Sequence, residues 1–322
     1  MKMKWSFLLI TAIAVSLFAG QKKETKVDSM VYETGAEWRI YSTDAAVKSF
    51  SMQRDLLWFI TEKSVGWMNM NSTKKADQQS FEDIGGVPAA DATCCAIDAS
   101  NTAWIGTKSG IAMRVKDSFK LFTKSNGLPD DKINQILIAK SGVWAATDNG
   151  VAVYQAGAWK AYGVADGLAG EKVHVMINGA NGAIWFGTNK GISSFEAGKW
   201  TTYTMKTGLS WNDTKALCYD PRSGNIWAAV GEKDINMYNG KEWKTFMDVA
   251  DGMVALMADS QSRIWLSHAA GLMKFNGDEW VTDPNKIGIT ATQVSSMFRD
   301  DKNNLWFGME KGVLKLNNPY PY

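Results

Sequence analysis

The fold is decided by the stretch Asn181-Gly182-Ala183-Ile184-Trp185-Phe186-Gly187-Thr188-Asn189-Lys190-Gly191-Ile192. It predicts a short strand centred on a tryptophan, a tight polar turn and the start of a second strand. The pattern recurs, and subtraction of the tryptophan numbers gives spacings of 46, 40, 41, 42, 38 and 41 residues. A repeat of about forty residues built from strands is typical of β-propellers. The seven tryptophans are Trp58, Trp104, Trp144, Trp185, Trp227, Trp265 and Trp306.

Three further strands accompany each tryptophan strand. An inner strand precedes it and is apolar on both faces, as in residues 173–177, which suits a strand packed between two neighbouring sheets. A third strand and an outer strand with an aromatic residue follow it. The pattern therefore predicts an all-β fold, a seven-bladed β-propeller of four-stranded antiparallel blades over residues 37–318. The outer strands are residues 37–41, 80–84, 118–122, 158–162, 199–203, 242–246 and 279–282.

The two ends of the repeat array complement each other. The seventh unit has no outer strand after residues 312–316, and residues 319–322 form a C-terminal tail. The strand that contains Trp38 is an outer strand with no unit before it. We therefore expect residues 37–41 to complete the last blade, which closes the ring and covers two sheet edges that would otherwise invite association.

The N-terminus has the pattern of an export signal. Lys2 and Lys4 precede an apolar run over residues 7–18, which is short for a membrane span. Residues 17–20 resemble a bacterial lipobox, but position 21 is Gln21 and not the cysteine that would carry the lipid. We expect residues 1–20 to be a signal peptide, residues 21–36 a polar tether, and the mature protein to be periplasmic or extracellular, with no transmembrane span. The alternative is an uncleaved N-terminal anchor.

The charge balance argues against two classes of partner. The net charge of +2 comes from the leader, because without residues 1–20 the chain has 33 basic and 33 acidic residues. A neutral chain without a basic tract gives no support for binding to nucleic acid or to an anionic membrane.

The cysteines and histidines form no recognisable metal or redox motif. Cys94 and Cys95 are neighbours on one predicted strand, so their side chains point to opposite faces, and Cys218 lies three units away. We expect all three to be small buried residues, with a vicinal disulfide or a metal site as the alternative. His174 and His268 belong to units two apart, so we expect no shared metal and no cofactor.

Polar residues recur where the inner strands begin. Loops from outer to inner strand and from second to third strand share one face of a propeller, where binding sites are usually found. The residue one position into the inner strand is polar in six of seven units. We predict a polar collar at the channel mouth that holds an acidic sugar or a carboxylate, the alternative being strand ends that are polar because they meet water. The column is Lys48, Thr93, Asn134, His174, Lys215, Val254 and Ser295, the preceding residues add Lys132, Lys172 and Asp213, and the cationic members are Lys48, Lys132, Lys172 and Lys215.

Trp211 has no role in the repeat. Twelve of the 15 tryptophans belong to second or outer strands and Trp5 to the leader, which leaves Trp67 and Trp211. Trp211 lies in a loop where the preceding unit has Gly170, and we expect it to be partly exposed and to bind a sugar face or a protein partner. The alternative is that it packs over the loop of a neighbouring unit.

The repeat, in which DGL is followed by IWFGT, GI and W..Y, resembles the two-component regulator propeller repeat over residues 38–316. The resemblance is strong in residues 126–162 and 166–203, whereas unit five departs from it at residues 228–230 and unit six at residues 267–268. It implies an extracytoplasmic sensor or a stand-alone secreted propeller, and it transfers no catalytic residue.

We therefore expect a monomeric, non-catalytic binding propeller that recognises a glycan, a peptide or an envelope protein at the channel-mouth face. The alternative is an enzyme, because the strands are also similar to those of seven-bladed lyases that open streptogramin antibiotics. Those lyases use a histidine and a metal site, and His174 is the one counterpart in this chain.

Overall fold

The computed structural model describes residues 27–31, 37–43, 45–71, 78–282, 294–310 and 312–317. The predicted signal peptide and the C-terminal tail lie outside these ranges, as does most of the predicted tether. No helix within the described residues has the length and apolar character needed to cross a membrane.

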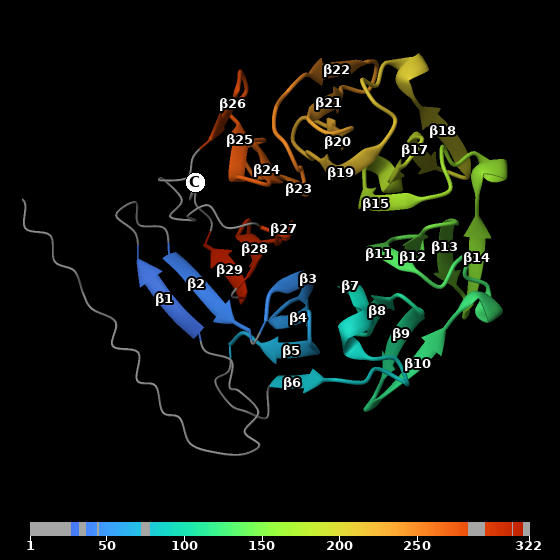
Figure 1. The fold of residues 1–322 in the computed structure, drawn as a ribbon, viewed down its shortest axis with the longest axis vertical. Helices are drawn as coiled ribbons and strands as arrows, with labels where there is room; N and C mark the ends of the chain where they lie inside the picture. The colour runs from blue at the N-terminus through green and yellow to red at the C-terminus, as the bar shows by residue number, and fades with distance from the viewer. Residues whose placement is uncertain are drawn as a thin grey trace, which may run out of the picture.

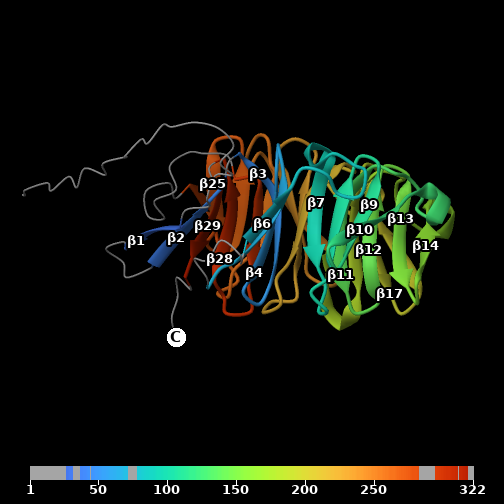
Figure 2. The same cartoon turned by 90° about the horizontal axis from the view of Figure 1, so that it is seen from below.

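The chain forms a seven-bladed β-propeller, as predicted (Figure 1). Each blade is an antiparallel meander in which consecutive strands pair, and the side view shows the blades standing next to each other in a flattened body (Figure 2). Within the described residues there are six four-stranded sheets and one five-stranded sheet.

The strands follow the order of the sequence from the first blade to the seventh. Blade one consists of β3 (Val47–Gln53), β4 (Leu56–Thr61), β5 (Val65–Asn69) and β6 (Gln78–Phe81), and blade two of β7 (Ala92–Ile97), β8 (Ala103–Thr107), β9 (Gly110–Val115) and β10 (Ser118–Phe122). Blade three consists of β11 (Ile133–Ala139), β12 (Gly142–Thr147), β13 (Gly150–Gln155) and β14 (Ala158–Tyr162). Blade four consists of β15 (Val173–Asn178), β16 (Ile184–Thr188), β17 (Gly191–Glu196) and β18 (Lys199–Tyr203). Blades five and six consist of β19 (Thr214–Tyr219), β20 (Ile226–Val230), β21 (Asp234–Tyr238) and β22 (Trp243–Phe246), then β23 (Ala255–Ala258), β24 (Ile264–His268), β25 (Gly271–Phe275) and β26 (Trp280–Thr282). Short 3-10 turns lie between strands at η2 (Ala89–Asp91), η3 (Lys124–Asn126), η4 (Val164–Asp166), η5 (Ala180–Gly182) and η6 (Met205–Thr207).

The seventh blade combines strands from both ends of the chain. It contains β27 (Ser296–Arg299), β28 (Leu305–Met309), β29 (Gly312–Leu316), β2 (Glu37–Ser42) and β1 (Val27–Val31). β2 pairs antiparallel with β29, with Trp38 opposite Leu316, and in Figure 1 the two strands lie next to each other. Closure of the ring requires this pairing. That the pairing closes and stabilises the whole ring remains a prediction. β1 falls within residues 21–36, which are expected to form a polar tether, and it pairs along the free edge of β2, which offers unpaired backbone groups.

The seven repeated tryptophans are core residues. Each is buried, with exposed fractions between 1% for Trp58 and 9% for Trp185. In five blades the indole stacks on the aromatic residue that ends the outer strand of the same blade, which explains why the two positions recur together. The stacked pairs are Trp58–Phe81, Trp104–Phe122, Trp144–Tyr162, Trp185–Tyr203 and Trp227–Phe246.

The turn sequence Asp166-Gly167-Leu168, which has counterparts in other blades, fixes the connection between the outer strand of one blade and the inner strand of the next. Leu168 follows Gly167 and is buried in the core between blades three and four. Gly167 has φ +118°, and a Cβ atom there would lie 2.6 Å from the Cβ of Trp200. Glycine is therefore required both by the backbone conformation and by the close approach of the outer strand. Leu128 and Leu209 occupy the same buried position in their own loops.

The three cysteines are buried and free, as expected. Cys94 packs in the core between blades two and three, whereas Cys95 packs in the core between blades one and two. Burial raises the pKa of Cys94 to about 11 and also raises the pKa of Cys218, so these thiols stay protonated at neutral pH.

Trp67 also has a structural role. The guanidinium carbon of Arg114 lies 5.6 Å from the centroid of the Trp67 ring and 5.3 Å from that of Trp58. Phe81 contributes a third ring at 5.5 Å, so the cation joins β9 to three aromatic side chains of blade one.

Candidate functional site

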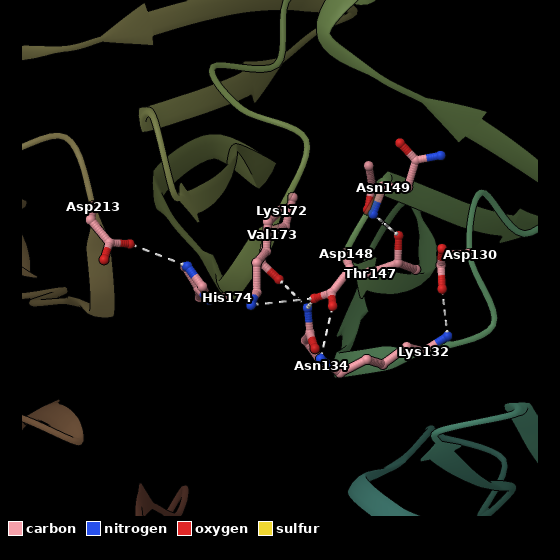
Figure 3. A network of polar contacts seen from close by, with 11 residues as sticks. Asp130, Lys132, Asn134, Thr147, Asp148, Asn149, Lys172, Val173, His174 and Asp213 are labelled. Carbon is pink, nitrogen blue, oxygen red and sulfur yellow. Dashed lines mark hydrogen bonds and ion pairs between the residues drawn. The ribbon is translucent and has the colours of Figure 1, made fainter.

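Predicted collar residues of blades three, four and five come together in one polar network (Figure 3). Those labelled in the figure are Lys132, Asn134, Lys172, His174 and Asp213. Each follows directly on the loop from the preceding outer strand, where the inner strand begins. The turns between second and third strands reach the same end of the meander, so a turn residue of one blade can contact an inner-strand residue of the same or the next blade. Two aspartates, Asp148 and Asp213, organise the polar residues that meet there.

Asp148 joins blades three and four. It lies in the turn between β12 and β13, and its Oδ2 atom accepts a hydrogen bond from Lys132 Nζ at 2.8 Å. Its Oδ1 atom accepts one from Asn134 Nδ2 at 2.9 Å and lies 3.9 Å from Lys172 Nζ. Asn134 Nδ2 also donates to the backbone oxygen of Val173 at 2.9 Å. Three predicted collar residues therefore converge on one carboxylate.

Asp213 joins blades four and five. Its Oδ2 atom lies 2.6 Å from Lys215 Nζ, and its Oδ1 atom lies 3.2 Å from His174 Nε2. Figure 3 shows Lys172 and His174 between the two carboxylates. The polar side chains thus form a continuous arc over three blades, in which positive and negative groups alternate.

The protonation states follow from burial and from these neighbours. Burial alone would raise the pKa of Asp148, but the hydrogen bonds from Lys132 and Asn134 and the charges of Lys132 and Lys172 outweigh it and hold the pKa below its usual value. Burial lowers the pKa of His174; the nearby cations act in the same direction, and together they outweigh the opposing effect of Asp213. At neutral pH Asp148 is ionised and His174 is an uncharged imidazole.

The structure thus brings together five predicted site residues but not the fourth cationic collar residue, Lys48. The five are Lys132, Asn134, Lys172, His174 and Lys215. Lys48 lies in β3 of blade one, is exposed and has no ion pair with any described residue. The lysines Lys132, Lys172 and Lys215 each lie within ion-pair distance of an aspartate. The arc is therefore a row of paired charges, in which these three cationic members of the predicted polar collar each have a carboxylate partner.

Sequence reasoning missed Asp148 as a site residue. It is 16 residues from Lys132 and 24 from Lys172 by subtraction, and no local spacing links them. The available signal was the turn between the second and third strands, in which blade three alone among the well-matched units has an aspartate, where blade two has Lys108 and blade four has Asn189.

Trp211 is both exposed and packed. It is 55% exposed, yet its ring lies against Gly231 in the turn between β20 and β21, where a Cβ atom would be 2.6 Å from Trp211 Cγ. It is two residues from Asp213, so it lies at the blade-five end of the arc. Two exposed methionines lie in loops that join an outer strand to the next inner strand. Met205 (52% exposed) lies between β18 and β19, and Met247 (72% exposed) lies between β22 and β23.

His268 has a different environment from His174. It is 8% exposed and occupies the strand position at which blades two to four have a threonine that caps the turn. Its Nδ1 atom accepts a hydrogen bond from the backbone N–H of Ala270 at 3.4 Å, much as Thr147 Oγ1 accepts one from Asn149. His268 therefore substitutes for the turn-capping threonine.

In the described ranges no three or more His, Cys, Asp or Glu side chains are grouped so that they could hold a metal ion.

Comparison with known proteins supports the fold. No family model matches the chain, and no curated protein matches it in sequence. Among solved structures it is similar to the extracellular domain of a protein described as a hybrid two-component system of Bacteroides thetaiotaomicron, with a TM-score of 0.66 and 15% identity over 86% of this chain and 40% of that one. It is also similar to a catalytically inactive histidine-to-alanine variant of virginiamycin B lyase from Staphylococcus aureus with quinupristin, with a TM-score of 0.68 and 16% identity over 91% and 99% of the two chains. A third similar structure is YCF48 bound to D1 peptide, with a TM-score of 0.65 and 14% identity over 91% and 99%. The chain spans less than half the length of the two-component structure.

Proposed function

We propose that this protein is a non-catalytic binding propeller that works outside the cytoplasm. It holds its ligand on the face that carries Trp211 and the arc of alternating charges over blades three to five. The ligand is a glycan, a peptide or a segment of an envelope protein. The observation that carries the proposal is the exposed indole of Trp211 beside the His174–Asp213–Lys215 group.

The paired charges determine which ligand chemistry suits this face. Each arc lysine has an aspartate within ion-pair distance, so a polyanion would have to compete with a carboxylate for every cation. A ligand that both donates and accepts hydrogen bonds can use lysine and amide donors together with carboxylate acceptors. An apolar ring face on the same ligand would stack on the indole. A neutral oligosaccharide or a peptide with a ring side chain satisfies both conditions.

The extracytoplasmic location is part of the proposal. It is supported by the leader pattern in residues 1–20 and by the extracellular origin of one of the similar structures. Expression of the full chain in a bacterium, followed by separation of periplasm, membrane and medium, tests it. Recovery of the full-length chain in the cytoplasm alone would contradict it.

Replacement of the exposed indole is the direct test of the binding face. Neutral hexasaccharides of glucose, xylose and N-acetylglucosamine, a hexagalacturonate and a proline-rich peptide are titrated by calorimetry. We expect at least one neutral probe or the peptide to bind, and Trp211→Ala to weaken its affinity by about 30-fold, because a central tryptophan in an interface contributes about 2 kcal/mol or more.

The matched control is Phe298→Ala, which removes an exposed aromatic ring from blade seven. Its affinity should equal that of the parent protein. If Trp211→Ala and Phe298→Ala bind every probe as the parent does, the ligand is not held at this face. A preference for the hexagalacturonate would restore the acidic ligand expected from the lysines.

A lyase is the second candidate, favoured by the 3.2 Å approach of His174 to Asp213. An uncharged imidazole next to a carboxylate is suited to remove a proton from a substrate. Incubation with quinupristin, followed by chromatography of the products, distinguishes the two functions. Turnover by the parent protein that disappears in His174→Ala would replace the binding proposal with the enzyme.

A further inference from the structure

We infer that Gly231 is a positioning residue: it seats the ring of Trp211, and the longer turn of blade five exists to form this seat. The inference rests on the proposed function, because it explains how the binding face is built. It concerns residues 210–213 in the loop that enters blade five and residues 231–233 in the turn between β20 and β21.

Blade five has a turn of a different length. In blades three and four the second and third strands are joined by two residues, so that Thr147 pairs with Gly150 and Thr188 with Gly191. The threonine hydroxyl donates to the glycine oxygen in each of these turns, at 2.8 Å and 2.7 Å. In blade five Val230 pairs with Asp234, which leaves three residues in the turn, and valine has no hydroxyl for the cap.

Large and small side chains have exchanged places between blades four and five. In blade four the loop residue is Gly170, and a Cβ atom there would lie 2.4 Å from Oδ1 of the turn residue Asn189. In blade five the loop residue is Trp211 and the turn residue is Gly231, where a Cβ atom would lie 2.6 Å from Trp211 Cγ and 2.7 Å from its Cδ1. One side chain fills the space in each blade, and the two arrangements exclude each other. The exchange indicates that Gly231 accommodates the indole.

Hydrogen bonds donated by two backbone N–H groups hold the seat on both sides. The Gly231 N–H donates to the oxygen of Asp213 at 2.7 Å, which joins the turn to the loop. On the other side of the tryptophan, the Ser210 N–H donates to Oδ1 of the fully buried Asn236 at 3.0 Å. Gly231 itself has φ +59°, a conformation in which a residue with a Cβ atom is strained.

A fixed indole has a clear advantage for binding. An aromatic ring that is already in position loses little conformational freedom when a ligand stacks on it. Gly231→Ala should leave the propeller folded, because the collision is confined to an exposed loop, but it should displace the ring. The matched control is Gly224→Ala in the same blade, since Gly224 has a similar φ of +79° and a Cβ atom there would have no neighbour within 4 Å.

The first experiment needs no ligand. The indole N–H resonance of Trp211 is identified by its loss in Trp211→Phe, and the chemical shift of this resonance is compared among the variants. The quenching of tryptophan fluorescence by acrylamide is compared in the same way, with Trp211→Phe giving the part that belongs to Trp211. We expect Gly231→Ala to shift the resonance and change the quenching, and Gly224→Ala to change neither. An unshifted Trp211 resonance in Gly231→Ala would overturn the inference, whatever the ligand turns out to be.

The second experiment uses the exchange itself. Gly231→Asn should lower the melting temperature, because the new side chain meets the indole. Adding Trp211→Gly, which restores the glycine–asparagine pair of blade four, should recover most of the loss, because the asparagine side chain then has the space that the indole occupied. A double variant that melts no higher than Gly231→Asn would contradict the reciprocal fit.

The third experiment joins the seat to function. The hexasaccharide of glucose, xylose or N-acetylglucosamine that binds the parent protein should bind Gly231→Ala about tenfold more weakly and Gly224→Ala equally well. Unchanged affinity in Gly231→Ala would refute the functional part of the inference. If no hexasaccharide binds the parent protein, the proposed function fails on that ligand class, while the resonance experiment still decides the role of Gly231.

Discussion

At the scale of the residue, His174 couples the arc to pH. Its pKa in the folded protein is below its ordinary value of 6.5 because of burial and the nearby cations. The unfolded chain therefore binds the proton more readily, so stability should fall as the pH decreases through 6.5 toward the lowered value. His174→Gln removes this term, and the stability difference between the variant and the parent protein should increase in favour of the variant from pH 7.5 to pH 5.

Urea unfolding at several pH values measures this difference. His268 also has a pKa lowered by burial, so both proteins retain its contribution and it cancels in the comparison. A stability difference that stays constant over the pH range would show that His174 has the same pKa in the folded and the unfolded chain.

At the scale of the element, a buried aspartate holds the turn that precedes the tryptophan strand. In blade six Asp259 is 1% exposed, and its Oδ1 atom accepts from the backbone N–H groups of Gln261 and Arg263. Its Oδ2 atom accepts from Trp265 Nε1 at 3.1 Å and from Arg263 Nε. Asp98 and Asp300 make the same bond to the tryptophans of their blades, at 3.0 Å and 2.9 Å.

Asp259→Ala should destabilise the protein by about 3 kcal/mol, because several buried donors lose their acceptor. Thermal unfolding measures the effect. Asp278→Ala, at an exposed position of the same blade, is the control and should lie within about 0.5 kcal/mol of the parent protein. Equal melting temperatures for the two variants would mean that the turn holds without its aspartate.

At the scale of the whole molecule, the ring depends on whether its last blade is completed by β2. Replacement of residues 37–41 by a Gly/Ser segment of equal length lowers the strand propensity of the segment that pairs with β29 while keeping the chain continuous. We expect a marked fall in melting temperature and a tendency to associate, because β29 would become an exposed edge. Calorimetry and size-exclusion chromatography measure both. An unchanged melting temperature in a monomeric protein would refute closure by this strand.

The sequence by itself determined the number of blades, the antiparallel meander and the burial of the seven tryptophans. These features depend on short-range patterns that recur once per blade, such as the apolar strand around Trp185 in β16 and the glycine that follows the outer strand at Gly167. In a repeat protein the strand assignment in one unit is also supported by the matching pattern in the other units. Assignment of the tryptophans to repeat positions also left Trp211 as a residue that the repeat does not explain.

Only the tertiary structure decided the character of the candidate site. Lys132 and Lys172 pair with Asp148, and Lys215 pairs with Asp213, so three of the four cationic members of the predicted polar collar have carboxylate partners and the charges alternate. The seat of Trp211 on Gly231 joins residues 20 positions apart, by subtraction. Such contacts depend on the distance between neighbouring loops, which is set when the blades pack against each other, and short-range sequence patterns contain no measure of that distance.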